Sequence, residues 1–239
     1  MLDNPLDLLH AADSPSALNP SQRMRVAYLL TMVGGFLDAY TYFERGGVFA
    51  NAQTGNIVKL GIALSNGARD AYLAYLMPIC VFSLGILTAL SIKEYLTRKE
   101  LRLIRRSVLA VEMVCLAIVG LIPLGERWDI FANCLVSFAA AMQYETFTTF
   151  RGEAIVTTMS TGNLRKCVDS LCEGVVRHDR AKLFRAGLYL SIILVFASGA
   201  FVGARVCELM GRAAVVPVIL ALGLVIAIIT VLRRRNSRR

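Results

Sequence analysis

A short polar segment occurs twice in this chain, and its repetition restricts the folds that the chain can adopt. The tripeptide Thr54-Gly55-Asn56, the first TGN motif, returns 107 positions later as Thr161-Gly162-Asn163, the second TGN motif. The same shift, applied without gaps to residues 38–61, gives six identities in 24 positions. Two charged pairs fall into register, Asp38 with Glu145 and Lys59 with Lys166. We interpret the chain as two copies of one unit, each built around a polar segment broken by glycine.

The composition places both copies in a membrane. Hydrophobic residues make up 56% of the chain and the mean hydropathy is +0.58, well above an ordinary soluble domain. The apolar residues come in blocks of about 20, the length of helix that crosses a hydrocarbon core of about 30 Å. The net charge of +9 arises from basic residues at the ends of these blocks, as the positive-inside rule describes. We therefore predict an all-α membrane protein that contacts the lipid bilayer and has no nucleic-acid partner.

Six apolar blocks predict six transmembrane helices within a single transmembrane domain at residues 23–232. The predicted helices span residues 24–43, 71–92, 107–124, 129–149, 186–207 and 213–232. The first repeat covers about residues 24–124 and the second about residues 129–232. Residues 1–22 contain three prolines and no basic segment before an apolar core, so they are expected to form a mobile cytoplasmic tail. Residues 233–239 are expected to form a basic cytoplasmic tail.

The basic connectors between spans indicate how often the chain crosses the membrane. If each TGN segment is re-entrant, the connectors at residues 93–106 and 165–185 and the arginine-rich C-terminus share one side. If each segment crosses, the first connector lies opposite the other two. The positive-inside rule favours two re-entrant segments and six spans. This arrangement places Lys99 and Arg180 in the cytoplasm and Gly67 and Gly125 outside.

Three spans per copy is an odd number, so the second repeat is predicted to be inverted relative to the first. Inverted repeats with broken helices that meet near the midplane are a recurring plan of secondary transporters. The alignment continues into the second span at a shift of 114, where Gly85 falls on Gly199 and Ala89 on Gly203. Small residues four apart allow helix backbones to approach closely, so these positions are expected to pack.

Each TGN motif is predicted to form the end of a broken helix. Glycine would supply the turn, and threonine or asparagine would bind the backbone groups that the turn frees. A half-helix starting at Asn56 or Asn163 would direct its amino end, with about half a positive charge, at the opposite segment. This geometry suits an anion or the carboxylate of a small metabolite. The alternative is that these side chains only satisfy backbone groups at the break.

The predicted solute-binding residues are those of the two motifs and the residue before each: Gln53, Thr54, Gly55, Asn56, Ser160, Thr161, Gly162 and Asn163. Because serine stands in the second copy where the first has glutamine, the two half-sites need not be equivalent.

Two carboxylates within the predicted spans are candidates for proton or ion coupling. Asp38 and Glu145 would be costly in hydrocarbon, and such residues usually face a cavity or a pathway. The alternative is a structural ion pair with Lys59 or Lys166, lysines that are also candidates for the solute site. Glu112 has no counterpart in the sixth span and lies near a basic connector, so we expect it to extend towards the membrane interface.

The cysteines and histidines suggest neither a metal site nor a cofactor. The cysteines form no CxxC or Cys/His pattern, and most lie in apolar surroundings, so we expect small buried side chains at positions 80, 115, 134, 167, 172 and 207.

The run GGFLDAYTYFERGGVFANAQTGNIVKLGIAL (Gly34–Leu64), together with VTTMSTGNL (Val156–Leu164), resembles the YoaK-like family of bacterial multi-pass membrane proteins. That family is catalogued as a domain of unknown function, and the resemblance covers residues 24–232. It implies a location in the bacterial inner membrane and is in keeping with the predicted number of spans. It supplies no substrate and no catalytic residues.

These observations predict a secondary transporter or channel for a small polar or anionic solute, bound between the two half-helix ends. Two other classes remain open. A membrane-embedded enzyme is one, although the chain has no HExxH motif and no serine–histidine or cysteine–histidine arrangement. A scaffold or assembly protein is the other, although it would have little use for two polar segments in register. The sequence is compatible with an oligomer but does not require one.

Overall fold

The computed structural model describes residues 20–67, 69–95 and 98–236. The expected N-terminal tail therefore lies outside the described residues except for its last three, which begin the first helix. At the other end the last helix extends to Asn236, so four of the seven residues of the expected C-terminal tail are helical and the other three lie outside the described residues. The chain is almost entirely α-helical, as predicted, apart from one short β-hairpin.

Long helices occupy the predicted spans, and a shorter helix follows each polar break. In chain order the helices are α2 (Pro20–Glu44), α3 (Gln53–Ser65), α4 (Arg69–Tyr95), α5 (Arg98–Leu121), α6 (Glu126–Thr146), α7 (Thr161–Val176), α8 (Arg180–Met210) and α9 (Val215–Asn236). The hairpin of β1 (Thr149–Phe150) and β2 (Glu153–Ala154) lies between α6 and α7, and the 3₁₀ helix η1 (Gly211–Ala214) joins α8 to α9.

Two helical stretches of the described chain are long and apolar enough to cross a membrane by length and composition. They are Ala71–Tyr95, which is most of α4, and Arg180–Val231, which contains α8, η1 and most of α9. In the most apolar 18-residue part of each stretch, only 22% and 28%, respectively, is buried. These two stretches are consistent with a protein that associates with a membrane.

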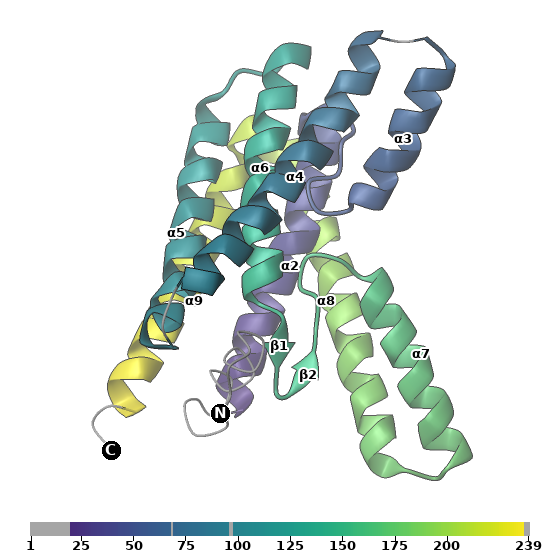
Figure 1. Ribbon diagram of the computed structural model, residues 1–239, viewed down its shortest axis with the longest axis vertical. Helices are drawn as coiled ribbons and strands as arrows, with labels where there is room; N and C mark the ends of the chain where they lie inside the picture. The colour runs from purple at the N-terminus through teal and green to yellow at the C-terminus, as the bar shows by residue number, and fades with distance from the viewer. Residues whose placement is uncertain (1–19, 68, 96–97, 237–239) are drawn as a thin grey trace.

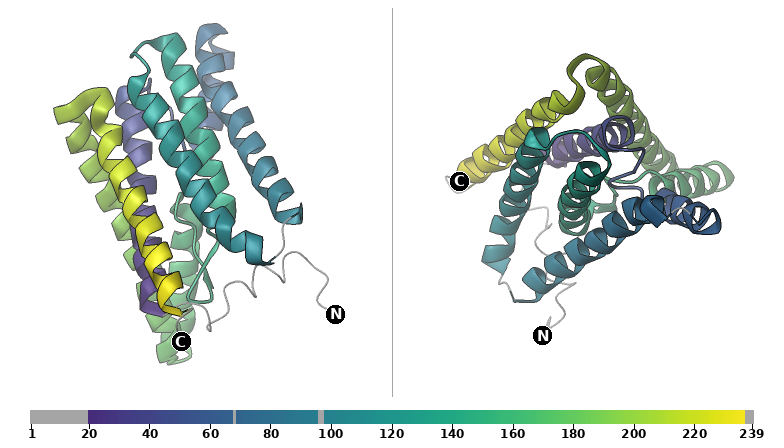
Figure 2. Two further views of the ribbon diagram at one scale, coloured as in Figure 1. Left: turned by 90° about the vertical axis from the view of Figure 1, so that its left-hand side faces the viewer. Right: turned by 90° about the horizontal axis from the view of Figure 1, so that it is seen from above.

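The helices pack in a regular set of pairs. α2 lies along α8, and α4 lies along α6, while α5 and α9 pack on each other and close the side of the bundle (Figures 1 and 2). α3 packs on α4, and α7 packs on α8. The largest buried cluster draws its residues mainly from α2, α5, α6, α8 and α9, with α2 and α6 buried along most of their length.

The two short helices run in opposite directions from the middle of the molecule. In Figure 1, α3 runs upward to the turn that leads into α4, and α7 runs downward to the turn that leads into α8. Their amino ends therefore both lie at mid-height. The start of α2, the end of α4, the start of α5, the α7–α8 turn and the end of α9 all lie towards the lower end in this view. Lys99 belongs to α5, but its side chain lies outside the described residues.

Glycines allow the closest approach between long helices. A Cβ at Gly35 would collide with the Phe196 carbonyl of α8, and a Cβ at Gly199 would collide with the Met32 carbonyl of α2. At the crossing of α4 and α6, a Cβ at Gly85 would lie 2.7 Å from the Phe138 carbonyl. The prediction that Gly85 and Gly199 are packing positions is therefore confirmed.

Replacing Gly199 should loosen the contact between α2 and α8. We expect Gly199→Ala to lower the melting temperature of purified protein by about 5 °C or more, because the added methyl group has no room beside the Met32 carbonyl. The matched control is Gly187→Ala in the same helix, where a Cβ meets nothing within 4 Å. Equal melting temperatures for the two variants would contradict the close crossing.

Candidate functional site

The TGN motifs form the first turns of α3 and α7 and do not form the breaks themselves. α3 begins three residues before Asn56, and α7 begins two residues before Asn163, so the predicted helix starts were late. Neither Gly55 nor Gly162 has a positive φ, and a side chain at Gly162 would meet nothing within 4 Å. The prediction that these two glycines supply the turns is therefore wrong.

The chain reverses further upstream, and it does so differently in the two copies. In the first copy Gly46 and Gly47 have φ values of 76° and 73°, in the left-handed region that favours glycine. In the second copy Arg151 and Gly152, with φ of 54° and 77°, form the two-residue turn of the β1–β2 hairpin. These turns do not coincide under the shift that relates the copies, so the repeat alone could not reveal them.

The asparagine side chain of each motif forms two hydrogen bonds with the residue seven positions upstream. It accepts from the backbone N–H of that residue and donates to its backbone carbonyl. Oδ1 of Asn56 accepts from the Phe49 amide at 3.0 Å, and its Nδ2 donates to the Phe49 carbonyl at 2.6 Å. Asn163 makes the same pair of bonds with Val156, at 3.2 Å and 2.6 Å. Each asparagine side-chain amide thus supplies the hydrogen bonds that a neighbouring strand would otherwise supply to this backbone segment.

The second N–H of each asparagine amide is also in use. Nδ2 of Asn56 donates to Oε1 of Gln53 at 2.9 Å, and Gln53 in turn donates to the Ala50 carbonyl at 2.9 Å. In the second copy, which lacks the glutamine, Nδ2 of Asn163 donates to the Met159 carbonyl at 3.1 Å. Both asparagines are fully buried. This geometry is the one described by the alternative interpretation, in which the asparagines satisfy backbone groups.

The lysine three residues after each asparagine makes a second contact with the upstream segment. Nζ of Lys59 donates to the Gly47 carbonyl, and Nζ of Lys166 donates to the Ala154 carbonyl, twelve residues back in both cases. The Lys59 ammonium also lies 4.8 Å and 5.0 Å from the centres of the Phe49 and Tyr42 rings. Asparagine and lysine together form what we call the upstream clamp, which both copies share.

The other predicted site residues lie around the amino ends of the two short helices. Thr54, Thr161 and Gly162 are exposed, and Gly55 is half-buried against the Phe49 ring. Ser160 is the residue before α7, and its Oγ is buried without a hydrogen-bond partner. The exposed groups and this hydroxyl are thus the parts of the two motifs that no protein contact occupies.

Asp38 lies at the amino end of α3. Its Oδ1 accepts from the Asn51 amide at 2.9 Å, and the carboxylate is 6% exposed. One turn later Thr41 accepts from the Ala50 amide at 3.2 Å. A carboxylate at a helix amino end interacts favourably with the partial positive charge there. Asp38 therefore already supplies α3 with the kind of negative group that a solute was predicted to supply.

Glu145 occupies the equivalent position of the second copy but has a different partner. Its Oε1 forms an ion pair with Nζ of Lys93 in α4 at 2.7 Å, and the lysine also donates to the Glu145 carbonyl. The alternative of ion pairs with Lys59 or Lys166 is not realised, because both lysines bind carbonyl groups of the upstream clamp. In the described residues the two carboxylates are thus bound in different ways.

The loops before α3 and α7 meet at Gly34 in the middle of α2. Nδ2 of Asn51, in the first loop, donates to the Gly34 carbonyl at 2.9 Å. A Cβ on Gly34 would lie 2.6 Å from the carbonyl oxygen of Thr157, in the second loop. Nε2 of Gln143 in α6 bonds Oγ1 of Thr157 at 3.3 Å. We call Asp38, Asn51, Gln143, Thr157 and Thr158 the junction cluster, since they link both copies.

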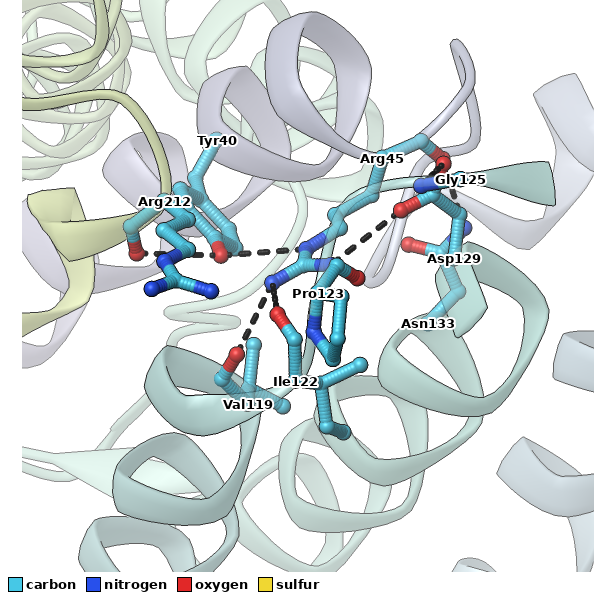
Figure 3. Close-up of polar contacts among 9 residues, drawn as sticks. All are labelled: Tyr40, Arg45, Val119, Ile122, Pro123, Gly125, Asp129, Asn133 and Arg212. Atoms are coloured by element: carbon cyan, nitrogen blue, oxygen red, sulfur yellow. Dashed lines mark hydrogen bonds and ion pairs between the residues drawn. The ribbon is translucent and has the colours of Figure 1, made fainter. Parts of the chain in front are cut away.

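A buried arginine that the sequence analysis did not single out joins four elements at the end of α2. Nη1 and Nη2 of Arg45 donate to three carbonyls at the end of α5 at 2.8–3.0 Å, and Nη1 also pairs with Asp129 of α6 at 3.1 Å (Figure 3). Nε donates to Tyr40, whose hydroxyl donates to the Arg212 carbonyl of η1. The Arg45 carbonyl accepts from Asn133. The only sequence signal for this role is the position of Arg45 just after an apolar block.

Glu112 differs from its expected position near the membrane interface. It lies in the second half of α5 and is 1% exposed, with Oε2 buried and without a hydrogen-bond partner. The expectation failed because the predicted third span began nine residues too late, so that Glu112 appeared closer to a helix end than it is. It stands apart from the other carboxylates of the described chain.

Substitutions at two glycines test whether glycine is required in the upstream turn or in the TGN motif. The two positions are Gly46, in the turn of the first copy, and Gly162, in the second TGN motif. Gly46→Ala should destabilise the fold by about 1–2 kcal/mol, because alanine resists the left-handed conformation. Gly162→Ala should be neutral or stabilising by up to about 1 kcal/mol, since the residue is helical. A Cβ at either position meets nothing within 4 Å. Denaturant unfolding of both variants tests this, and greater damage from Gly162→Ala would restore the original prediction.

Removing the Arg45 guanidinium should be strongly destabilising. Arg45→Met leaves three carbonyls and the Asp129 carboxylate without their donors, so we expect a loss of about 3–5 kcal/mol or failure to accumulate. The control is Arg205→Met, which removes an arginine from an exposed pair with Glu208 and should leave the melting temperature within about 2 °C. Similar losses for both variants would refute the role assigned to Arg45.

In the described part of the chain, no group of three or more histidine, cysteine, aspartate or glutamate side chains is placed to hold a metal ion. Neither the curated proteins nor the solved structures gave a match. One family does match, described as "Protein of unknown function (DUF1275)", over residues 26–229. This match is consistent with the resemblance to the YoaK-like membrane proteins. Because it covers most of the sequence, the chain belongs to the DUF1275 family.

Proposed function

We propose that this protein is an integral membrane transporter with six membrane-spanning helices and two re-entrant half-helices. The spans are α2, α4, α5, α6, α8 and α9, and the half-helices are α3 and α7. Large apolar side chains lie exposed along α4 and α8, among them Leu84, Leu87, Leu194 and Phe201. Exposed apolar surface of this kind is unusual on soluble monomers and supports contact with lipid.

The pairing of helices supports two inverted halves. In an inverted repeat, α2 would correspond to α6 and α4 to α8. The packing of α2 on α8 would then correspond to the packing of α6 on α4, and these two helix contacts are among the largest in the described chain. The pairs α3–α4 and α7–α8 correspond in the same way. α3 and α7 run in opposite directions, as an inverted repeat requires (Figure 1).

The distribution of basic residues supports an orientation in the bacterial inner membrane. The end of α4, the start of α5, the α7–α8 turn, the start of α2 and the end of α9 lie towards the same end. Arginine and lysine are frequent in these segments. By the positive-inside rule this end is cytoplasmic, which leaves the α3–α4 and α5–α6 connections outside.

One observation carries the transport proposal: the amino ends of the two half-helices both lie at mid-height of the molecule (Figure 1), and only one has a protein carboxylate. Asp38 serves the amino end of α3. At α7 the equivalent Glu145 is paired with Lys93, and Ser160 makes no capping hydrogen bond. A small polar or anionic solute would bind at the amino end of α7, with the backbone amides and the Ser160 hydroxyl as donors.

Transport accounts for this arrangement better than catalysis or assembly does. A catalytic site needs a nucleophile or a general acid and base held together, and the described junction supplies a single carboxylate. A scaffold needs no buried polar junction in the centre of the bundle, where each unpaired group is costly. A solute pathway requires polar groups at that depth.

A negative charge beside α7 should abolish binding of an anionic solute without unfolding the protein. Small anions such as phosphate, sulfate and short carboxylates are first tested for thermal stabilisation of the purified protein, and those that bind are then tested for flux into liposomes. Ser160→Asp should remove both effects, because aspartate is a favourable N-cap residue but repels an anion. Asn66→Asp, at the far end of α3, is the control with the same charge change.

The outcomes separate the proposals. Stabilisation and flux that are lost in Ser160→Asp and kept in Asn66→Asp would support a solute site at α7. Binding and flux that survive Ser160→Asp would exclude an anion site there. If no small solute in the panel stabilises the protein or crosses the membrane, the transport proposal fails and a scaffold role becomes the better description.

A further inference from the structure

The junction cluster combines a buried carboxylate with three buried oxygen atoms that have no hydrogen-bond partner. These atoms are Oδ1 of Asn51, Oε1 of Gln143 and Oγ1 of Thr158. Asn51 is fully buried, and Gln143 and Thr158 are each 1% exposed. Buried polar atoms are normally paired, so several orphaned oxygens in linked residues indicate that something is bound there.

The orientation of Asn51 makes its orphaned atom an acceptor. Its Nδ2 donates to the carbonyl of Gly34, a group that can only accept, so the remaining side-chain atom is an oxygen. Thr157 and Thr158 are the residues of the second loop that contact Gly34, through the Thr157 carbonyl oxygen and the Thr158 Cα, and the buried Thr158 hydroxyl has no hydrogen-bond partner. The cluster therefore offers oxygen atoms from both halves of the molecule, beside the Asn51 backbone amide that donates to Asp38.

The charge of the cluster is also unbalanced. Among the described residues no lysine or arginine pairs with Asp38, whereas Glu145, its counterpart, is paired with Lys93. The Asn51 amide at the start of α3 compensates part of the negative charge. Buried charges in membrane proteins are usually paired, so an ionised Asp38 carboxylate would require a positively charged partner.

We propose that the junction cluster binds one monovalent alkali-metal cation, with the Asp38 carboxylate as the counter-charge. Oδ1 of Asn51, Oε1 of Gln143 and Oγ1 of Thr158 are the neutral ligands. Hard cations bind oxygen atoms of carboxylate, amide and hydroxyl groups, and one carboxylate with neutral oxygens suits a single charge better than two. Unwound loop segments beside half-helices are also where transporters bind coupling ions.

The binding site does not depend on the transport proposal, but its use for coupling does. Ligands come from α2 and the first loop on one side and from α6 and the second loop on the other, so a cation would hold the two halves together. A solute at the amino end of α7 lies beside the same second loop. Occupation of the cation site would therefore favour the arrangement of that loop which binds the solute.

The proposal is tested by thermal unfolding of the purified full-length protein in NaCl, KCl and LiCl, with choline chloride at equal ionic strength as the reference. We expect a saturable rise in melting temperature with at least one alkali chloride and none with choline. Asp38→Asn should abolish the rise. That variant retains an oxygen to accept from the Asn51 amide, so it keeps the structural contact.

A second pair of variants keeps the test informative if Asp38→Asn does not fold. Thr158→Val is isosteric and removes a hydroxyl that has no hydrogen-bond partner, so it should leave the fold intact and weaken cation binding about tenfold. Ser137→Ala removes another unpartnered buried hydroxyl, six residues and about 9 Å along α6 from Gln143, and should leave binding unchanged.

Each result decides between the two proposals. Alkali stabilisation that Thr158→Val weakens and Ser137→Ala preserves would support the cation site, even if no solute is transported. An alkali response that is equal in wild type, Asp38→Asn and Thr158→Val would place the ion elsewhere and overturn the proposal. A wild-type protein that responds to pH but not to any alkali chloride would show that the carboxylate takes a proton, while solute flux in the same liposomes would leave the transport proposal standing.

Discussion

A backbone group without a hydrogen-bond partner in an apolar bundle costs several kcal/mol, and this protein brings its chain back into the bundle twice. The upstream clamp is the response to that constraint. Asn56 and Asn163 each pair with both main-chain groups of a residue seven positions earlier, and Lys59 and Lys166 bind a carbonyl nearby. The starts of both half-helices, and hence the junction between the loops, depend on this pairing.

The two copies share the clamp but differ in their charges. Asp38 accepts a hydrogen bond from the backbone before α3, whereas Glu145 forms an ion pair with Lys93 of α4. Gln53 accepts from the Asn56 side chain and donates to the Ala50 carbonyl, a link that the shorter Ser160 does not make. Arg45 falls on Gly152 under the shift that relates the copies, and so has no counterpart. Selection for folding would preserve the upstream clamp in both copies. Selection for a bound ligand would act on the charged residues, so these residues would be able to differ between the copies.

The sequence predicted the helices well and the site only in part. Apolar blocks located every long helix, because burial in a bundle and length across a membrane impose the same pattern. The repeat identified the TGN motifs, but their roles as the first turns of helices depend on contacts with residues outside the motif. The turns at Gly46-Gly47 and Arg151-Gly152 break the repeat, and the partners of Asp38 and Arg45 are set by tertiary packing. Orphaned atoms such as Oδ1 of Asn51 can be recognised only once every neighbour is placed.

The arginine contacts at the end of α2 have a mechanical consequence. Because one guanidinium holds the end of α5, the start of α6 and, through Tyr40, η1, the bundle behaves as a rigid body at that end. In a transport cycle of the proposed kind, this end would resist opening more than the opposite end does. The left-handed pair Gly46-Gly47 follows Arg45 directly and is the natural hinge, since it joins the fixed helix to the α3–α4 arm. An alternating-access cycle built on this chain would have to open both ends in turn, so at this end it would have to move the α3–α4 arm about the glycine pair or break the Arg45 contacts.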